Sequence, residues 1–417
     1  MTTDRATTTT PVRRRPRDRK AQIVRVAANA FGERGYHAVG VDEIAAEIGI
    51  SGPALYRHFP NKYALFVATA DAIVDRLLAV TEAPQHLPDA RDRLAATVHE
   101  IVAVTIDNRR SGGIYRWESR YLDDHDRERF RVLWDEVNQR VARPLHELRP
   151  RLPESDIAML AAATLSVIAS ITVHRIALSA GRTEALIDGL ARSVLECELP
   201  TAPTELAAST RHDGGLAVAA KRESLIAAAL EIFDKRGYHE ATIEEIGVVA
   251  GITASSVYRY FAGKAEILAA VFYRASERLA VATSDALGEA ADPAAAMDNL
   301  VTRYVRLAFV NPALISVYFA EFGNLPARER SDLRALQSQH IEEWVHLLTA
   351  QFPGLGTVAA RFRVHAALGL VLDVGRLIRF DNSPQSRARV ATLMKTVLRA
   401  GAPASDAHPD DAATPTL

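Results

Sequence analysis

Apolar residues recur at helical spacing along most of the chain. In the segment 20–34, one face of the expected helix carries Ile23, Val24, Ala27, Ala30 and Phe31. Gly35 follows and can end this helix in a left-handed conformation. The same pattern returns in 222–236 and ends at Gly237. We therefore expect two amphipathic helices, each packed against a local core.

Two short helical segments with a glycine between them follow each of these helices. The first pair lies in 39–62, which reads VGVDEIAAEIGISGPALYRHFPNK, and the second in 241–264, which reads ATIEEIGVVAGITASSVYRYFAGK. Gly49 and Gly251 can take the positive φ that lets two helices pack at a steep angle. This is the pattern of a helix-turn-helix, whose second helix enters the major groove of DNA. The chain repeats the motif at a displacement of 202 positions.

The residues that start these helices differ between the two copies. Thr242 and Glu245 have the spacing of a capping box, in which each side chain satisfies a free backbone amide. In the first copy Gly40 takes the place of this threonine, which predicts a weaker start. Ser51 and Thr253 are expected to cap the second helix of each motif.

Beyond each helix-turn-helix the sequence has helical patterns almost throughout. The helices expected in the first half are 62–81, 89–108, 113–122, 125–150, 154–180 and 183–199. Those expected in the second half are 264–284, 293–310, 312–323, 326–351, 356–380 and 384–401. The sequence therefore predicts an all-α fold built from two like units.

Composition suggests where these units begin and end. The stretch 200–215 (PTAPTELAASTRHDGG) has the composition of a linker. The N-terminal end of the chain is rich in Thr, Pro and charged residues, and the C-terminal end is rich in Pro, Asp and Ala. The expected division is a disordered basic arm over 1–18, a helix-turn-helix domain over 19–65, a helical effector and dimerisation core over 66–199, a linker over 200–216, a second helix-turn-helix domain over 217–267, a second core over 268–401 and a disordered tail over 402–417.

Bulk properties exclude several classes of protein. The single cysteine, Cys197, excludes an internal disulfide framework, and the 13 histidines do not cluster as metal ligands. No Walker loop, dinucleotide fingerprint, nucleophile elbow or HExxH motif occurs, so we expect neither enzyme activity nor a cofactor. The first 20 residues contain no apolar signal, and 157–173 is too short and polar for a membrane span. We expect a cytoplasmic protein without a membrane partner.

The repeated motif resembles the N-terminal signature of the TetR family of bacterial transcriptional regulators. The first copy carries Phe31, Arg34-Gly35-Tyr36, Asp42-Glu43-Ile44-Ala45, Gly49-Ile50-Ser51, Leu55-Tyr56-Arg57-His58-Phe59 and Lys62. The second copy carries Phe233, Gly237-Tyr238, Glu245-Ile246, Gly251-Ile252, Tyr258-Arg259-Tyr260-Phe261 and Lys264. The signature covers about 45 residues in each copy, and the helical remainder is compatible with the family.

The resemblance implies a three-helix DNA-binding head and a helical core with an effector pocket in each unit. It also implies dimerisation through the last two long helices of each core, for which the apolar segments 157–180 and 358–380 are candidates. In this family an effector typically separates the heads and releases the operator, and most members are repressors. Because one chain holds two units, it can form an intramolecular pseudo-dimer, or two chains can pair like with like.

The expected partner is a double-stranded DNA operator. The recognition helices are expected over 52–59 and 254–261, with Phe59 and Phe261 packed into the heads. Residues expected at the DNA by chemistry or by match to the family are Arg13, Arg14, Arg15, Lys20, Ser51, Gly52, Pro53, Tyr56, Arg57, His58, Lys62, Thr253, Ala254, Ser255, Tyr258, Arg259, Tyr260 and Lys264. Long side chains that could contact base edges are scarce here, so DNA shape is expected to contribute to specificity.

The second expected partner is a small hydrophobic or amphipathic effector of unknown identity. Polar and aromatic residues on otherwise apolar core helices are its candidate contacts: Tyr115, Trp117, Arg120, His174, Arg175, Tyr304, Tyr318, His365 and Arg376. Two alternatives stay open. In the first alternative only one head binds DNA, because only the first head has the basic arm. In the second, the protein is a sensor or interaction protein that keeps the heads as scaffold.

Overall fold

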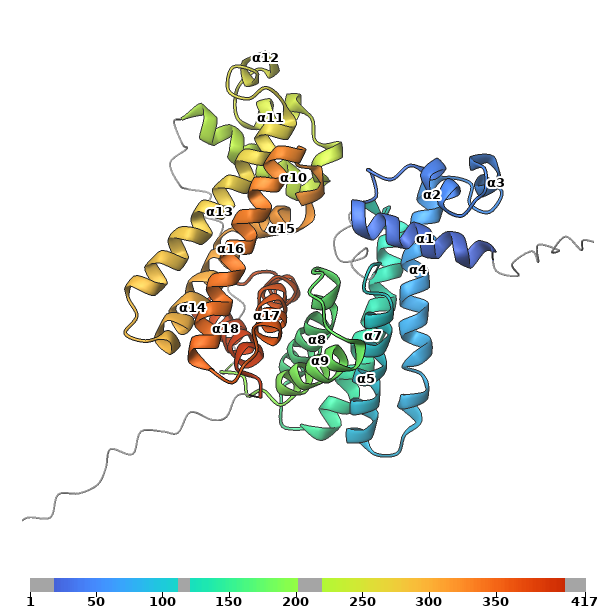
Figure 1. The fold of residues 1–417 in the computed structure, drawn as a ribbon, viewed down its shortest axis with the longest axis vertical. Helices are drawn as coiled ribbons and strands as arrows, with labels where there is room; N and C mark the ends of the chain where they lie inside the picture. The colour runs from blue at the N-terminus through green and yellow to red at the C-terminus, as the bar shows by residue number, and fades with distance from the viewer. Residues whose placement is uncertain (1–18, 112–120, 202–219, 402–417) are drawn as a thin grey trace, which may run out of the picture.

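The computed structural model describes residues 19–111, 121–201 and 220–401. Every regular element in these ranges is a helix, which confirms the expected all-α fold. Figure 1 shows two helical units side by side, with the helix-turn-helix heads at the same end of the molecule.

The first unit is built in the order that the sequence predicts. Its helices are α1 (Arg19–Arg34), α2 (Val41–Glu47), α3 (Gly52–Tyr56), α4 (Lys62–Val80), the 3₁₀ turn η1 (Ala83–His86), α5 (Ala90–Asp107), α7 (Asp124–Leu148), α8 (Glu154–Ala169), the 3₁₀ turn η3 (Ser170–Thr172) and α9 (Ala180–Leu195). Most of the helix expected over 113–122 lies outside the described residues.

The second unit repeats this order. Its helices are α10 (Lys221–Glu240), α11 (Ile243–Val249), α12 (Ala254–Val257), α13 (Lys264–Gly288), α14 (Pro293–Val310), α15 (Pro312–Ala320), the 3₁₀ turn η4 (Phe322–Asn324), α16 (Ala327–Gln351), α17 (Thr357–Leu377) and α18 (Pro384–Arg399). Helix α10 bends at Gly237, whose φ is 78°, so the end expected at this glycine is present as a kink.

The helix expected over 154–180 is wrong in its second half. Helix α8 ends at Ala169, and the chain leaves helical geometry after η3. The guanidinium of Arg109 donates hydrogen bonds to the backbone carbonyls of Ile171, His174 and Ile176 at 2.8, 3.2 and 3.1 Å. These bonds satisfy carbonyls that a continued helix would have paired internally.

Each unit has a head core, and one larger core joins the units. The head cores contain Phe31 and Phe66 in the first unit and Phe233 and Phe272 in the second. The joint core includes buried residues of α5, α7, α8 and α9 together with residues of α14, α16, α17 and α18. Helices α4 and α13 connect head to core, because each begins beside the recognition helix and ends in the joint core.

The apolar stretch Glu154–Thr172 is long and apolar enough to cross a membrane by composition alone. In the structure 72% of its tested window is buried, and α8 packs against α7, α9 and α17. The same test is passed by Pro293–Val310 together with Pro312–Tyr318, a pair of helices bent by 97°. Packing inside the joint core accounts for the apolar character of α8.

Candidate DNA-binding heads and effector site

The two recognition helices are short, and an exposed tyrosine lies at the end of the first and directly after the second. Gly49 and Gly251 both have a φ of 68°, which confirms the turn expected before each helix. Helix α3 ends at Tyr56 and α12 at Val257, earlier than the ends expected at 59 and 261. Tyr56 is 48% exposed. Its counterpart Tyr258, directly after α12, is 56% exposed.

The residues expected at the DNA are mostly on the surface of the heads. Exposed side chains are Lys20, Ser51, Pro53, Tyr56, Arg57, His58, Thr253, Ser255, Tyr258, Arg259 and Tyr260. Gly52, Ala254, Lys62 and Lys264 are half-buried, and Arg13, Arg14 and Arg15 lie outside the described residues. Phe59 and Phe261 are buried in the head cores, as expected.

The helix starts agree with the sequence analysis at three of four positions. Ser51 accepts a hydrogen bond from the Ala54 amide at 3.4 Å. Thr242 and Glu245 form the expected capping box, and Gly40 supplies no side-chain cap. Thr253 differs from the expectation, because its side chain makes no capping bond. Its hydroxyl instead lies 3.1 and 3.0 Å from those of the two following serines, 255 and 256.

The two signature lysines are held by the heads themselves. The Lys62 amine donates to the carbonyl of His37 at 3.3 Å and lies 4.6 Å from the Tyr36 ring centroid. The Lys264 amine donates to the carbonyls of His239 and Ala241 at 3.2 and 2.8 Å. Burial lowers the pKa of both lysines. Each lysine therefore ties the segment that follows Gly35 or Gly237 to the start of α4 or α13.

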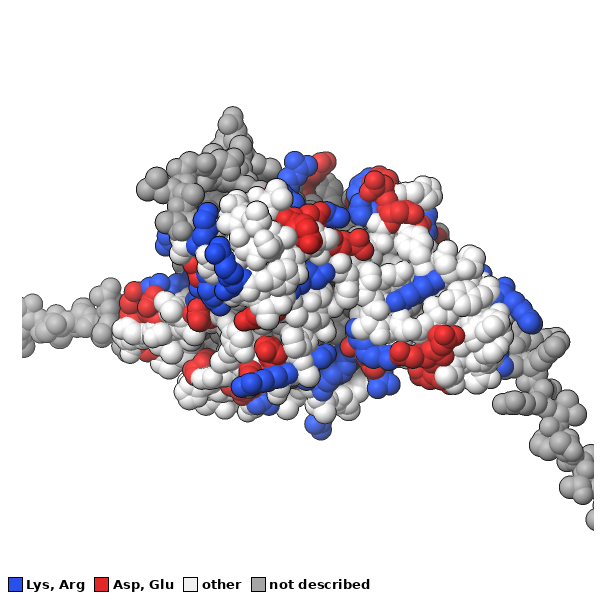
Figure 2. Space-filling view, turned by 90° about the horizontal axis from the view of Figure 1, so that it is seen from above, with Lys and Arg blue, Asp and Glu red and all other residues white. Residues whose placement is uncertain are grey.

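Charge is mixed on the end of the molecule that carries the heads. Figure 2 shows Lys and Arg interspersed with Asp and Glu over the described surface, with wide uncharged areas between them. The densest basic cluster of the sequence, Arg13 to Arg15, lies outside the described residues. Within the described heads, exposed polar and aromatic side chains are therefore the main candidates for DNA contact.

The heads contact each other through a pair of histidines. The rings of His37 and His239 are stacked, with centroids 4.1 Å apart and an interplanar angle of 27°. On the second unit, His239 Nε2 also lies 2.8 Å from Asn324 Oδ1. Beside it, the buried carboxylate of Glu321 accepts a hydrogen bond from the Tyr238 amide at 2.9 Å. The end of α15 and η4 therefore positions the last turn of α10, which meets the first head.

Buried polar side chains gather in the core of the second unit. Tyr304 and Tyr318 are buried close to each other, and burial raises the pKa of both, that of Tyr318 to about 12. The Tyr304 ring packs edge-on against Trp344 at 5.8 Å between centroids. The indole N–H of Trp344 donates to Nε2 of His340 at 3.2 Å.

Two more polar residues complete this cluster at the Tyr318 hydroxyl. Gln337 and Ser276 lie near enough to this hydroxyl to partly offset the rise in its pKa. Apart from this approach, the buried Ser276 hydroxyl has no hydrogen-bond partner among the described residues. We call this group the Tyr304 cluster: Ser276 of α13, Tyr304 of α14, Tyr318 of α15 and Gln337, His340 and Trp344 of α16.

Of the nine expected effector contacts, only Tyr304 and Tyr318 belong to this cluster. His174 and His365 stack on each other between the two units, with ring centroids 4.5 Å apart. Arg175 and Arg376 are exposed, and Tyr115, Trp117 and Arg120 lie outside the described residues. Gln337, His340 and Trp344 are not among the expected contacts, although their spacing of three and four residues puts them on one helix face.

The two units meet through α8 and α9 of the first and α17 and α18 of the second. These are the helices expected to form a four-helix interface. The Arg389 guanidinium lies 2.6 Å from the Asp156 carboxylate, and Ser166 donates to Asp373 at 2.5 Å. Arg389 also donates to the carbonyl of Pro200 at 2.9 Å, directly before the region expected to link the units.

Comparison with known proteins identifies the two heads. Residues 23–69 and 225–271 each match the family described as bacterial regulatory proteins, tetR family. The chain is 45% identical over 87 residues to the HTH-type transcriptional activator FasR of Mycolicibacterium smegmatis, covering 20% of this chain and 40% of FasR. It is 32% identical over 109 residues to the nucleoid occlusion factor SlmA of Pasteurella multocida, covering 25% of this chain and 53% of SlmA.

Another match, with 37% identity over 78 residues, is an HTH-type transcriptional repressor of Mycobacterium tuberculosis. The match covers 19% of this chain and 42% of that repressor. The chain therefore spans about half the length of these relatives.

Solved structures match one unit at a time. The TetR-family regulator PfmR from Thermus thermophilus is 22% identical with a TM-score of 0.38, and covers 42% of this chain and 97% of its own. A TetR-family regulator from Bordetella parapertussis is 18% identical with a TM-score of 0.39. The match covers 44% of this chain and 94% of that regulator.

Proposed function

The chain belongs to the TetR family of bacterial transcriptional regulators as a tandem duplication, and we propose that its two heads bind one DNA operator as an intramolecular pseudo-dimer. The proposal extends to repression of the controlled gene until a small effector binds and releases the operator. The observation that supports the pseudo-dimer best is the buried Asp156–Arg389 ion pair between the units.

This ion pair discriminates between the possible pairings of the units. The interface helices correspond at a displacement of 203 positions, as between Glu154 and Thr357, which begin α8 and α17. Asp156 therefore corresponds to Ala359, and Arg389 to Leu186. Two first units facing each other would set the buried aspartate opposite leucine, and two second units would set arginine opposite alanine. Both arrangements leave a buried charge unpaired, which is strongly unfavourable.

The proposed release depends on the contacts between the heads. His37 stacks on His239, and the last turn of α10, which carries His239, is held by residues at the end of α15 and in η4. A movement of α15 that breaks these contacts changes how the heads are placed relative to each other. Because a pseudo-dimer binds only half-sites at a matching distance, such a change lowers its affinity for the operator.

The operator proposed for this chain has two unlike halves. At the start of the recognition helices, the first head presents Gly52, Pro53 and Ala54, and the second Ala254, Ser255 and Ser256. Different side chains in the major groove select different bases or different DNA shapes. We therefore propose an operator less palindromic than that of a homodimer.

DNase footprinting combined with mass measurement of the complex tests the proposal. DNA flanking the protein's own coding region serves as target, with binding measured at several salt concentrations. The proposal predicts a salt-dependent footprint with two unlike half-sites occupied by one chain. A perfect inverted repeat filled by one chain would exclude the asymmetric operator. A complex of two chains would exclude the pseudo-dimer, and the absence of specific binding would favour a sensor or scaffold.

Paired substitutions test whether both heads take part. Tyr56→Phe with Arg57→Gln changes the first head, and Tyr258→Phe with Arg259→Gln changes the second. Similar losses of operator affinity support binding by both heads, whereas a loss confined to the first pair means that the second head does not bind. The matched relatives include an activator and a repressor. A reporter gene under control of the operator therefore measures whether this chain activates or represses transcription. Activation of the reporter would refute repression and leave the operator proposal standing.

A further inference from the structure

The two heads meet through residues at equivalent positions. His37 and His239 are displaced by 202 positions, and each follows the Gly-Tyr pair of the repeated signature. Their rings are stacked, with centroids 4.1 Å apart. Equivalent residues of two like units meet each other at the two-fold axis that relates the units. The histidine contact therefore lies on the approximate two-fold axis of the pair of heads.

Each histidine is also held by the same position of its own unit. The His37 ring packs edge-on against Tyr121, with centroids 4.4 Å apart and an interplanar angle of 80°. The His239 Nε2 atom lies 2.8 Å from Asn324 Oδ1. Tyr121 and Asn324 correspond to each other at the displacement of 203 positions that relates the cores. The contact between the heads is therefore supported from both cores.

The backbones of the two units approach each other beside the histidines. A Cβ atom at Gly323, in η4 of the second unit, would lie 3.9 Å from the carbonyl oxygen of Arg34, which ends α1 of the first head. This is the distance of a van der Waals contact. The stacked rings therefore belong to a wider contact, in which η4 lies against the first head.

The histidine positions are connected to the recognition helices. The carbonyl oxygens of His37 and His239 accept hydrogen bonds from Lys62 and Lys264 at 3.3 and 3.2 Å. These lysines begin α4 and α13, and a few residues separate each of them from the recognition helix before it. Each histidine therefore moves together with the recognition helix of its own head.

The joint core by itself leaves the distance between the heads adjustable. The helices that connect head and core, α4 and α13, have 19 and 25 residues and span about 28 and 37 Å. A tilt of about 6° at the core end of such a helix displaces its head by about 3 Å. The rise of one base pair of DNA is about 3.4 Å. A small adjustment in the core is therefore enough to change the spacing by a base pair.

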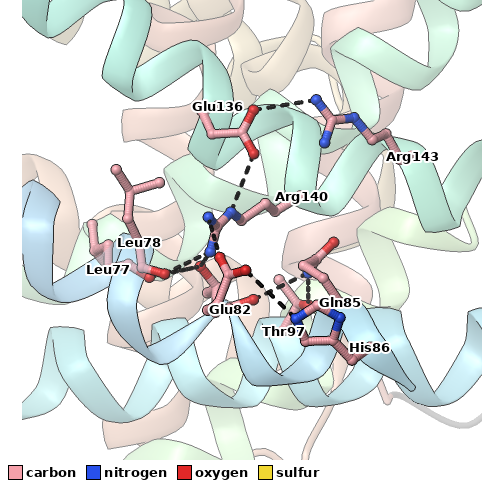
Figure 3. A network of polar contacts seen from close by, with 10 residues as sticks. Leu77, Leu78, Glu82, Gln85, His86, Thr97, Glu136, Arg140 and Arg143 are labelled. Carbon is pink, nitrogen blue, oxygen red and sulfur yellow. Dashed lines mark hydrogen bonds and ion pairs between the residues drawn. The ribbon is translucent and has the colours of Figure 1, made fainter.

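The two connecting helices are held unequally at their core ends. Figure 3 shows Arg140 of α7 at the end of α4, where it donates to the Leu78 carbonyl at 2.5 Å and to the Thr81 hydroxyl at 2.9 Å. Glu343 stands at the corresponding position of the second unit, and a carboxylate offers acceptors in place of these donors. The end of α13 is held instead by ion pairs of Arg303 with exposed carboxylates, which contribute little. The second head is therefore placed less firmly by its connecting helix.

We infer that the stack of His37 on His239 sets the spacing between the two half-sites that the chain binds. This inference rests on the proposed function, in which both heads bind one operator. Each base pair added between the half-sites moves one of them by about 3.4 Å along the DNA and by about 34–36° around it. A head that follows this movement has to leave the stack. The two histidines are thus specificity-determining residues that act through the placement of the heads.

Cross-linking of the full chain tests the contact without DNA. In the variant His37→Cys/His239→Cys, a short bis-maleimide should join the two heads within one chain, which changes the mobility of the denatured chain in a gel. Cys197 is buried, so the single variants His37→Cys and His239→Cys are matched controls that should give no internal cross-link. Absence of the internal cross-link from the double variant would overturn the inference.

Gel shifts on a series of operators test the spacing. The operator found by footprinting is compared with versions that have one or two base pairs more or fewer between the half-sites. Wild-type affinity should fall at least about tenfold at each altered spacing. His37→Ala/His239→Ala should bind the altered spacings about three- to tenfold more tightly than wild type, because no stack has to break. A head that is merely destabilised cannot give this gain, since it binds every spacing more weakly.

Two further variants separate the stack from other effects. His37→Phe/His239→Phe keeps two aromatic rings in contact and should keep the wild-type preference for one spacing. His86→Ala/His346→Ala removes one exposed histidine from each unit outside the heads, and its affinities should stay within about twofold of wild type. A Phe variant as tolerant of altered spacing as the Ala variant would exclude ring stacking as the cause.

The outcomes distinguish this inference from the proposed function. If the Ala variant keeps the wild-type preference for one spacing, or binds every spacing more weakly, the inference is wrong and the proposed function stands. If the wild-type chain binds no specific DNA, the proposed function is wrong and the inference falls with it. An internal cross-link together with tighter binding of the Ala variant to the altered spacings supports both.

Discussion

The carboxylate of Asp156 in the first unit and the guanidinium of Arg389 in the second form an ion pair of 2.6 Å, with side chains only 9% and 2% exposed. Their symmetry-related positions, Ala359 and Leu186, carry no charge. The contact between the units is therefore chemically asymmetric although the helices repeat. A charge pair that occurs once in a repeated interface distinguishes one unit from the other.

Replacing one partner of this pair should destabilise the chain far more than replacing both. Asp156→Ala or Arg389→Leu alone leaves a buried charge and should cost about 3–5 kcal/mol of unfolding free energy. The double variant copies the residues at the symmetry-related positions and should recover most of this loss. Urea unfolding followed by circular dichroism measures both effects.

The exposed pair of Glu136 and Arg143 is the control for this experiment. It lies on the surface of one helix at 3.2 Å, so Arg143→Ala should cost less than about 1 kcal/mol. A double variant as unstable as the sum of the single variants would show that the buried pair has no coupling of its own.

The sequence predicted the heads well because their signals are local. Gly49, Gly251, Ser51 and the Thr242–Glu245 capping box act through neighbours within a few residues, and all are found as expected. The Tyr304 cluster was predicted only in part, because it joins four helices that are distant in sequence. Local spacing shows which face of a helix is apolar, but it does not show which side chains of other helices meet there.

The end of α8 illustrates the same limit. Residues after 169 are as compatible with a helix as those before, so the sequence pattern predicts a helix that continues to 180. Arg109, which lies on another part of the chain, donates to the carbonyls of Ile171, His174 and Ile176. Hydrogen bonds from a residue distant in sequence therefore end α8 earlier than local helix propensity predicts.

The stacked pair of His174 and His365 should make stability depend on pH. Burial lowers the pKa of His174 to about 2, helped by the nearby charges of His365, Arg109 and Arg175. Burial lowers that of His365 to about 4, opposed by Glu342. The unfolded chain therefore binds more protons between about pH 4 and 6.5, so stability present at pH 7 is lost as the pH falls through this range.

His365→Gln should reduce this pH dependence by up to about 1.4 kcal/mol for each pH unit below 6.5, because glutamine does not titrate. Urea unfolding at pH 7, 6 and 5 measures the slope. His58→Gln, in an exposed position of the first head, serves as the control and should leave the slope unchanged. An identical slope in His365→Gln and wild type would contradict the assignment.

Lys62 and Tyr56 should have separable roles. The Lys62 amine donates to a carbonyl of its own head, so Lys62→Met should lower head stability by about 1 kcal/mol. Tyr56 is exposed, so Tyr56→Phe should leave stability within about 0.5 kcal/mol and weaken operator binding by about tenfold. Thermal unfolding and gel shifts on the same proteins test this. Weaker DNA binding by Lys62→Met without any loss of stability would instead favour direct phosphate contact by the lysine.

The unequal starts of α2 and α11 predict opposite effects of exchanging their caps. Gly40 has a φ of −84° and a ψ of 144°, which any residue can adopt, and an added Cβ would lie 3.3 Å from the flexible end of Glu43. Gly40→Thr should stabilise α2 by about 0.5–1 kcal/mol through a new cap and a less flexible unfolded chain. Thr242→Ala should destabilise α11 by about 1 kcal/mol, because the capping box is lost.

Hydrogen exchange resolved by helix is the suitable measurement for these caps, since it reports each head separately. Amides of α2 should exchange more slowly in Gly40→Thr, and those of α11 faster in Thr242→Ala. Gly49→Ala provides the contrasting control, because its φ of 68° disfavours any side chain and should destabilise the first head. Faster exchange of α2 in Gly40→Thr would mean that Glu43 cannot move aside, and that its ion pair with Arg34 contributes more than the new cap.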